Sequence, residues 1–183
     1  MYKLCKTEQS AQRQRELEYG LLDAMLVKNY EDISISDLCD HLQIPRKSFY
    51  RYFSSKDGAF HALLDHTLQD CNHFLNPFDE PNVTFEAYFQ FWLGQKPLLD
   101  ALERSGLSGK LVERTVNTAM VDQGFAARML RTFPDLNQQH VVLFIISGLM
   151  SVVIQWHHSG CVQTPRQMAK TVVRLLTKPL FPI

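Results

Sequence analysis

The sequence has few cysteines and lacks the features of a secreted or membrane protein. Its four cysteines are widely separated and form no Cys-x-x-Cys pair, which argues for reduced thiols and against a disulfide framework. No apolar stretch near the N-terminus resembles a signal peptide. The longest apolar run, 141–156, is interrupted by Ser147, Gly148 and Ser151 and is shorter than the roughly 20 residues that span a bilayer. We therefore expect a soluble, cytoplasmic protein without a membrane partner.

Motifs of catalysis are also missing, and the chain carries no net charge. It contains no Gly-rich phosphate loop, no nucleophile elbow and no His-Glu-x-x-His motif, so we expect no enzymatic activity and no cofactor. The 19 basic residues are balanced by 19 acidic ones. A nucleic acid could then be bound only through a local cluster of cations, because the charge of the whole molecule gives no attraction.

Residues 34–44 predict a short capped helix followed by a turn. Ser34 precedes Asp37 by three residues, which is the signature of a capping box at a helix N-terminus. The apolar side chains that follow recur at helical spacing and predict one buried face: Ile35, Leu38 and Leu42. Gln43 and Ile44 form the predicted turn.

Residues 45–53 predict a second short helix, and basic residues extend along its outer face and on to Lys56. Pro45 suits the first turn of a helix, because its locked φ is tolerated there. Phe49 and Phe53 are four residues apart and should pack back onto the first helix. Between Arg46 and Lys56 there are four basic residues and no acidic one. Such a helix fits the major groove of DNA, where basic, hydroxyl and aromatic side chains contact phosphates and base edges.

This stretch resembles the N-terminal signature of TetR/AcrR-type transcriptional regulators. The resemblance rests on the capped helix, the tight turn, the ending Tyr50-x-x-Phe53 and the step Ser55-Lys56-Asp57. It implies phosphate contacts by Tyr50, Tyr52 and Lys56, and base or phosphate contacts by the three residues after Pro45. The DNA-binding residues expected on these grounds are Ser34, Ser36, Pro45, Arg46, Lys47, Ser48, Tyr50, Arg51, Tyr52 and Lys56.

Four residues depart from the pattern of that family: Gln43, Pro45, Gly58, which should loosen the start of the next helix, and Cys39, a small residue in place of a usual Ala. Gln43 stands where the family usually has glycine, which adopts a positive φ without steric cost, so we expect a strained or shifted turn. Pro45 replaces a usual Ser or Thr, so we expect the side-chain cap of the second helix to be missing.

The helical periodicity continues through the whole chain and predicts an all-α fold. A brace helix from Thr7 or Ser10 to about Asn29 precedes the helix-turn-helix, and residues 1–6 are expected to form a loose arm. We predict a DNA-binding domain at 1–56 and a helical effector-binding and dimerisation domain at 57–183, joined by a long helix at about 57–75. Further helices are expected at 98–104, 108–120, 125–133 and 137–159, and from Pro165 to just before Pro179.

The last two predicted helices suggest a homodimer. The helix at 137–159 is apolar around most of its circumference, so it must be covered on nearly all sides. A second copy of the chain is the expected cover, and the family resemblance implies a four-helix interface. The expected interface residues are Val141, Phe144, Ile145, Gly148, Leu149, Val152, Trp156, Met168, Val172, Leu175 and Leu176.

The middle of the chain is rich in aromatic residues and provides a candidate ligand chamber. Family resemblance implies that a small-molecule effector bound there controls binding to a double-stranded DNA operator, usually in the direction of repression. An apolar or aromatic effector is expected, although any single one of these residues is more often ordinary core, because pockets and cores share this composition. The candidate lining residues are Phe85, Tyr88, Phe89, Trp92, Leu111, Thr115, Phe125 and Phe144.

Other functions remain open from the sequence. A metal sensor would use His66, Asp70 and His73 on one helix face, with Cys71 nearby or with the pair His157-His158, but the spacing matches no strong metal motif. We therefore expect no metal. A redox sensor would use Cys39 or Cys71, of which Cys39 is expected to be buried and inert. The main alternative is a helical, dimeric interaction or sensor protein that does not read DNA.

Overall fold

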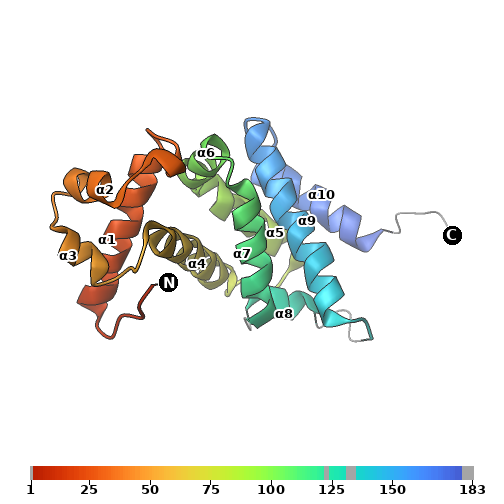
Figure 1. Cartoon of the computed structure of the whole chain (residues 1–183). Helices are drawn as coiled ribbons and strands as arrows, with labels where there is room; N and C mark the ends of the chain where they lie inside the picture. The colour runs from red at the N-terminus through yellow and green to blue at the C-terminus, as the bar shows by residue number, and fades with distance from the viewer. Residues whose placement is uncertain (1, 122–123, 131–134, 179–183) are drawn as a thin grey trace. The chain divides into compact units, whose positions relative to one another are not determined.

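The computed structural model describes residues 2–121, 124–130 and 135–178, and this part of the chain is mainly helical (Figure 1). Within these residues there is no β-strand, which confirms the predicted all-α class, and an isolated β-bridge pairs Tyr2 with Phe53. The helices are α1 (Glu8–Met25), the 3-10 turn η1 (Tyr30–Asp32), α2 (Ile35–His41), α3 (Arg46–Tyr50), α4 (Lys56–Leu75), α5 (Pro81–Gly94), α6 (Lys96–Arg104), α7 (Ser108–Val121), α8 (Phe125–Leu130), α9 (Gln138–His158) and α10 (Pro165–Thr177).

The chain divides into two compact units that do not follow the sequence strictly. The first contains the residues up to Thr67 together with Pro97–Leu107, and the second contains Leu68–Lys96 together with the residues from Ser108 onwards. Helix α4 contributes to both units, while α6 joins the first unit although it lies late in the sequence. The functional boundary expected at residue 56 stays a prediction.

In the first unit, α1 packs against α2, and α2 packs against α3. Gly20 of α1 makes this close packing possible, because a Cβ atom there would lie 2.4 Å from Cδ2 of Leu42. The core of the unit is made of fully buried apolar side chains from all its elements, including Leu21, Leu38, Phe49 and Leu64. Helices α1 and α2 therefore support α3 from its buried side.

The second unit is built from two pairs of packed helices, α5 with α10 and α7 with α9. Thr164 caps α10 through a capping box with Gln167, as the sequence predicted. The predicted end of α8 near Phe133 lies outside the described residues. Helix α9 has 21 residues, longer than the apolar run seen in the sequence, and is long and apolar enough to cross a membrane by length and composition. Half of its most apolar stretch is buried in the structure, and core helices of soluble proteins meet the same criteria of length and composition.

The N-terminal arm is docked onto the first unit, and the expectation of a loose arm was wrong. The backbone N–H of Lys3 donates to the carbonyl oxygen of Tyr52 (3.0 Å), and the hydroxyl of Tyr2 donates to Asp65 (2.9 Å). The buried side chain of Gln14 in α1 donates to the carbonyl of Lys3 (3.1 Å). The arm thus joins α1, α4 and the segment directly after α3.

Candidate nucleic-acid interface and ligand pocket

The capping box of α2 forms as predicted. Oγ of Ser34 accepts a hydrogen bond from the backbone N–H of Asp37 (3.0 Å), and the Asp37 carboxylate accepts one from the backbone N–H of Ser34 (2.9 Å). The hydrogen bonds from Ser34 lower the pKa of the Asp37 carboxyl. Two N–H groups that no helical carbonyl can reach are satisfied in this way, which fixes the first residue of α2.

The turn between α2 and α3 places Gln43 in the left-handed region, with a φ of 51°. Its backbone N–H donates to the carbonyl of Asp40 (3.1 Å), and the N–H of Ile44 donates to the carbonyl of Cys39 (2.9 Å). These two bonds define a Schellman motif, the helix ending that usually has glycine at this position. The turn therefore keeps the geometry that glycine would give, and Gln43 adopts a backbone conformation that is strained for a residue with a Cβ atom.

Helix α3 is anchored by two phenylalanines whose side chains are 0% exposed, Phe49 and Phe53. Their ring centroids lie 5.3 Å apart, so the buried side of the helix is fixed against the first unit. Pro45 is the N-cap residue and makes no side-chain capping bond, as the sequence predicted. The helix ends at Tyr50, three residues earlier than the predicted end at Phe53, and a turn carries the chain to Phe53.

The opposite side of α3 faces solvent and carries the basic residues. Tyr50 is 47% exposed, and its ring meets that of Phe49 edge-on at 5.7 Å. The guanidinium of Arg46 donates a hydrogen bond to Oγ of Ser36 in α2, which joins the two helices at this surface. Of the ten predicted DNA-binding residues, the exposed ones are Ser34, Pro45, Arg46, Lys47, Tyr50 and Arg51, and the half-buried ones are Ser36, Ser48, Tyr52 and Lys56.

Lys56 lies in a different environment from the other basic residues. Its ammonium group donates to the carbonyl oxygens of Tyr30 (2.5 Å) and Ile33 (2.7 Å), and it lies 4.3 Å from the centroid of the Tyr30 ring. The next residue, Asp57, accepts a hydrogen bond from the Tyr30 hydroxyl (2.6 Å). The start of α4 therefore holds the segment that leads into α2, an arrangement that no local sequence pattern revealed.

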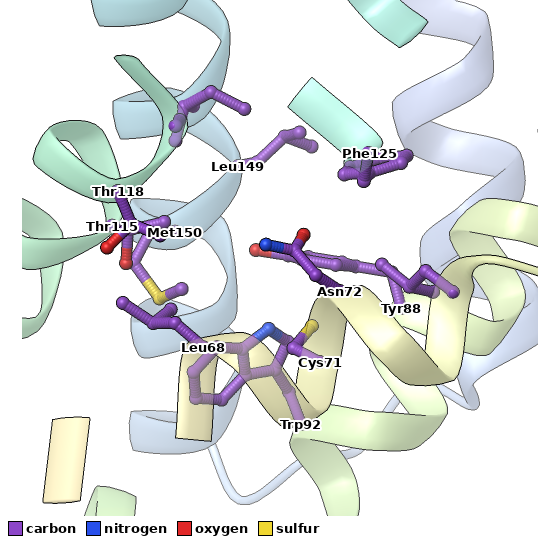
Figure 2. Close-up of a pocket in the computed structure, with 13 residues that line it drawn as sticks. Leu68, Cys71, Asn72, Tyr88, Trp92, Thr115, Thr118, Phe125, Leu149 and Met150 are labelled. Carbon is purple, nitrogen blue, oxygen red and sulfur yellow. The ribbon is translucent and has the colours of Figure 1, made fainter. Parts of the chain in front are cut away.

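The predicted ligand chamber corresponds in part to a cavity in the second unit. This cavity has a volume of about 40 Å³, and Figure 2 shows side chains from α4, α5, α7, α8 and α9 around it. Of the eight predicted lining residues, Tyr88, Trp92, Thr115 and Phe125 line it. Sequence reasoning missed the contribution of α4, whose Leu68, Cys71, Asn72 and Leu75 form one wall. These residues recur at helical spacing on the predicted connecting helix, but nothing in that pattern separates a cavity wall from ordinary core.

The other four predicted lining residues lie elsewhere. Phe89 packs edge-on against Trp156 with a centroid distance of 5.5 Å, and Leu111 is fully buried, so both belong to the core. Phe85 lines a second, more open cavity of about 260 Å³, to which Phe125 also contributes. Phe144 is 75% exposed and lies in a surface groove between α9 and α10.

The predicted dimer residues differ in their exposure to solvent. Six of them are buried within the second unit by the chain itself: Val141, Ile145, Leu149, Trp156, Met168 and Val172. The exposed ones are Phe144, Gly148, Leu175 and Leu176, and Val152 is half-buried. The groove between α9 and α10 contains Phe144, Leu175 and Leu176 and has a volume of about 470 Å³. A second copy could therefore contact fewer of the predicted interface residues than the sequence suggested.

Of the side chains considered for metal chemistry, His66 has a structural contact. Nδ1 of His66 lies 2.9 Å from the fully buried carboxylate of Glu18, which Arg15 also contacts at 3.2 Å. Across the described ranges, no group of three or more potential metal ligands occurs. Burial raises the pKa of both the Cys39 and the Cys71 thiol, which keeps them in the unreactive protonated form.

The capped helix, the tight turn and the short anchored helix with a basic outer surface define a helix-turn-helix DNA-binding protein. Residues 24–63 match the family model of bacterial regulatory proteins of the tetR family, and residues 110–178 match the model of a transcriptional regulator C-terminal region. The chain belongs to the TetR family of transcriptional regulators. Proteins of this family are in general DNA-binding regulators and not enzymes. No curated protein is significantly similar to the chain in sequence.

Solved structures show the same fold at low sequence identity. A TetR-family transcriptional regulator from Syntrophomonas wolfei is 13% identical, with a TM-score of 0.70, over 94% of this chain and 98% of that one. The fatty acid degradation regulator FadR from Bacillus halodurans is 13% identical, with a TM-score of 0.64, over 91% and 99%. The dihydroxyacetone kinase operon activator DhaS is 13% identical, with a TM-score of 0.60, over 90% and 93%.

Proposed function

We propose that this protein is a cytoplasmic, homodimeric repressor that releases its DNA operator when a small molecule binds in the second unit. The observation that carries the proposal is the surface of α3, where basic and hydroxyl groups face solvent above a buried pair of phenylalanines. A helix of this kind enters the major groove with its first residues towards the base edges. In this chain those residues are Arg46, Lys47 and Ser48.

The contacts expected with DNA follow from exposure and chemistry. Arg46 and Lys47 are exposed cations and are assigned to base edges or phosphates, whereas Tyr50 and Tyr52 are assigned to phosphates through their hydroxyls. The docked arm adds a contact that the sequence did not suggest, because the ammonium of Lys3 lies 3.4 Å from the carbonyl of Tyr50 at the end of α3. Lys3 is therefore a further candidate for phosphate binding.

Dimerisation supplies the second recognition helix. One copy of α3 offers few base contacts, so a two-fold dimer that places two such helices on half-sites gives affinity and site length together. The support for this dimer is the exposed apolar surface of α9 and α10, where Phe144, Leu175 and Leu176 line one groove. Gly148 and Ser151 on the same helix are exposed and small, which allows a partner helix to approach closely.

Control by an effector is supported by the cavity of about 40 Å³ in the second unit. Helix α4 forms one wall of this cavity and begins at Lys56, directly after the segment that follows α3. A ligand that favours one of two arrangements of α4 would alter the separation of the two recognition helices and thereby the DNA affinity. Repression is the direction we propose from the family resemblance, although one structurally similar protein is by name an activator.

The proposal is tested by fluorescence anisotropy with the duplex that lies upstream of the coding sequence. The wild-type chain should bind with a steep dependence on salt, and the triple variant Arg46→Ala, Lys47→Ala and Tyr50→Ala should lose specific binding. The matched control removes two exposed cations from the second unit, Lys110→Ala with Arg166→Ala, and should bind as the wild type does.

Two results would count against the proposal. One is equal affinity of the triple variant and the control double variant, because DNA binding would then not involve α3. The other is the absence of binding to any duplex at low salt, which would favour a helical interaction protein. A transcription assay with the same upstream region then reads the direction of control, since added protein should lower transcription from a repressed promoter.

A further inference from the structure

Within the described part of the chain, the cavity of the second unit contains a buried hydrogen-bond donor without an acceptor. The side chain of Trp92 is 1% exposed, and among the described residues its Nε1–H has no hydrogen-bond partner. In Figure 2 the indole nitrogen of Trp92 points into the cavity, where the side chains of Tyr88 and Asn72 also converge. A buried donor left unpaired costs roughly 1–3 kcal/mol, so native proteins rarely keep one without a reason.

The indole ring is held in this orientation by its neighbours. Phe91 meets it edge-on with a centroid distance of 5.5 Å, and Tyr88 meets it at 6.4 Å. Burial and then Cys71 raise the pKa of the Tyr88 hydroxyl, whereas the neighbouring Trp92 indole lowers it. Among the described residues, however, the indole N–H has no acceptor in hydrogen-bond geometry. The donor is therefore fixed in position and available to another acceptor.

The remaining lining determines which acceptor fits. Among the described residues, the lining of the cavity includes no Asp, Glu, Lys, Arg or His, and most of the lining residues are apolar. A charged ligand would lose its hydration there without gaining a partner charge. The hydroxyl of Thr115 already donates to the carbonyl of Leu111 (2.7 Å), so it does not compete as a donor. A neutral ligand with one oxygen acceptor matches this set of groups.

We propose that the cavity binds an uncharged, largely apolar small molecule whose carbonyl or ether oxygen accepts a hydrogen bond from Nε1 of Trp92. The binding itself does not depend on the proposed function; only the inference that this ligand controls DNA binding rests on it. Binding would satisfy the indole donor and bury apolar surface against Leu68, Leu149 and Met150, which line the same cavity.

Phe125 sets the size of the ligand that the cavity accepts. This residue lines both the inner cavity of about 40 Å³ and the outer one of about 260 Å³. Its ring stacks on Tyr88 at 5.9 Å and meets Phe85 edge-on at 5.8 Å. If this ring turned aside, the joined space would reach roughly 300 Å³, the lower end of the volumes of ligand pockets. A long ligand would thus keep its oxygen at Trp92 and extend past Phe125.

The test compares two probes that differ only in the acceptor. Cyclopentanone and methylenecyclopentane have the same number of heavy atoms, with a carbonyl oxygen in one and a CH₂ group in the other. Each is titrated into the full-length, ¹⁵N-labelled protein while the indole N–H signals are observed. The chain has two tryptophans, and the Trp156 indole already donates to the carbonyl of Gln163 (2.9 Å), so its signal is the internal reference. The variant Trp92→Phe assigns the other signal.

The ketone should shift the Trp92 signal and bind about three- to tenfold more tightly than the alkene, which corresponds to one net hydrogen bond. Trp92→Phe should bind both probes equally, whereas Tyr88→Phe should keep the preference. Phe125→Leu should keep it too and should additionally bind acetophenone more tightly than the wild type does. The wild-type and Tyr88→Phe measurements decide the matter even if Trp92→Phe is unstable.

Several results would overturn the inference. These are equal affinity of the two probes in the wild type, a preference that survives in Trp92→Phe, a preference that is lost in Tyr88→Phe, and the absence of any shift of the Trp92 signal with either probe. The same protein without any probe is also titrated with the upstream duplex. DNA binding by the probe-free protein, together with no Trp92 shift on adding a probe, refutes the ligand class alone. A Trp92 shift on adding a probe, together with no DNA binding by the probe-free protein, refutes the regulator and leaves the ligand class standing.

Discussion

The strained turn between α2 and α3 yields a prediction about stability. Gln43 has a φ of 51°, a conformation that costs an L-residue roughly 1–2 kcal/mol because its Cβ approaches the following carbonyl. Glycine has no such cost but loses more chain entropy on folding, by about 0.4–1 kcal/mol. The difference predicts that Gln43→Gly stabilises the first unit by roughly 0.5–1 kcal/mol.

Urea unfolding followed by far-UV circular dichroism and by tryptophan fluorescence tests this value. Both tryptophans lie in the second unit, so their fluorescence serves as an internal reference for the part of the chain that the substitution does not touch. Amide hydrogen exchange of Leu38 and Cys39 reports α2 directly and should slow in the variant. Because the Schellman bonds already have the geometry that glycine gives, DNA affinity should stay within about twofold of the wild type.

Two control variants separate the backbone effect from loss of the side chain. Gln43→Ala keeps a Cβ atom and should gain nothing, whereas Gln90→Gly in the middle of α5 should destabilise the protein by about 1 kcal/mol. The reasoning is refuted if Gln43→Gly is no more stable than Gln43→Ala. It is also refuted if Gln90→Gly stabilises the protein, because glycine would then help irrespective of φ.

Two further predictions follow from other contacts. Lys56→Met should lower the free energy of unfolding by roughly 1.5–3 kcal/mol, because charged hydrogen bonds to the carbonyls of Tyr30 and Ile33 are lost. It should leave the slope of log DNA affinity against log salt concentration unchanged, whereas Lys47→Met should reduce the steepness of that slope by about 0.9. A reduced slope in Lys56→Met with unchanged stability would show that Lys56 binds phosphate instead. Phe144→Glu should reduce the mass measured by light scattering from that of a dimer to the 21.2 kDa of one chain, because a charge would enter the apolar groove. The control Val27→Glu changes a residue that is equally exposed but lies in the first unit, and it should remain dimeric. A dimeric Phe144→Glu would show that the groove at α9 is not part of the interface.

The parts of the molecule that the sequence predicted correctly are governed by residues close together in the chain. The capping boxes at Ser34 and Thr164 formed as expected because each needs only two residues three apart. The strain at Gln43 was predictable for the same reason, since a tight turn after a short helix requires a positive φ regardless of what surrounds it. The buried positions of Phe49 and Phe53 followed from their spacing of one helical turn.

The sequence misjudged features that depend on which helices meet. Residues 1–6 contain no periodic apolar pattern. No local sequence signal therefore predicted the hydrogen bond from Tyr2 to Asp65 or the one from the backbone N–H of Lys3 to the carbonyl of Tyr52. The apolar surface of α9 is visible in the sequence, but only the packing of α7 against α9 decides that Leu149 is buried and Phe144 exposed. Likewise, aromatic composition predicts a chamber without separating the cavity wall at Trp92 from the core contact at Phe89.

By itself the sequence determined the all-α class, the helix-turn-helix and the basic surface of α3, because helix periodicity, capping and turn geometry act over a few residues. Only the tertiary structure decided that the Lys56 ammonium is bound by backbone carbonyls and that the Trp92 indole donor faces a cavity. Both features arise where segments far apart in the chain come together, so they depend on three-dimensional packing, which no local sequence pattern encodes.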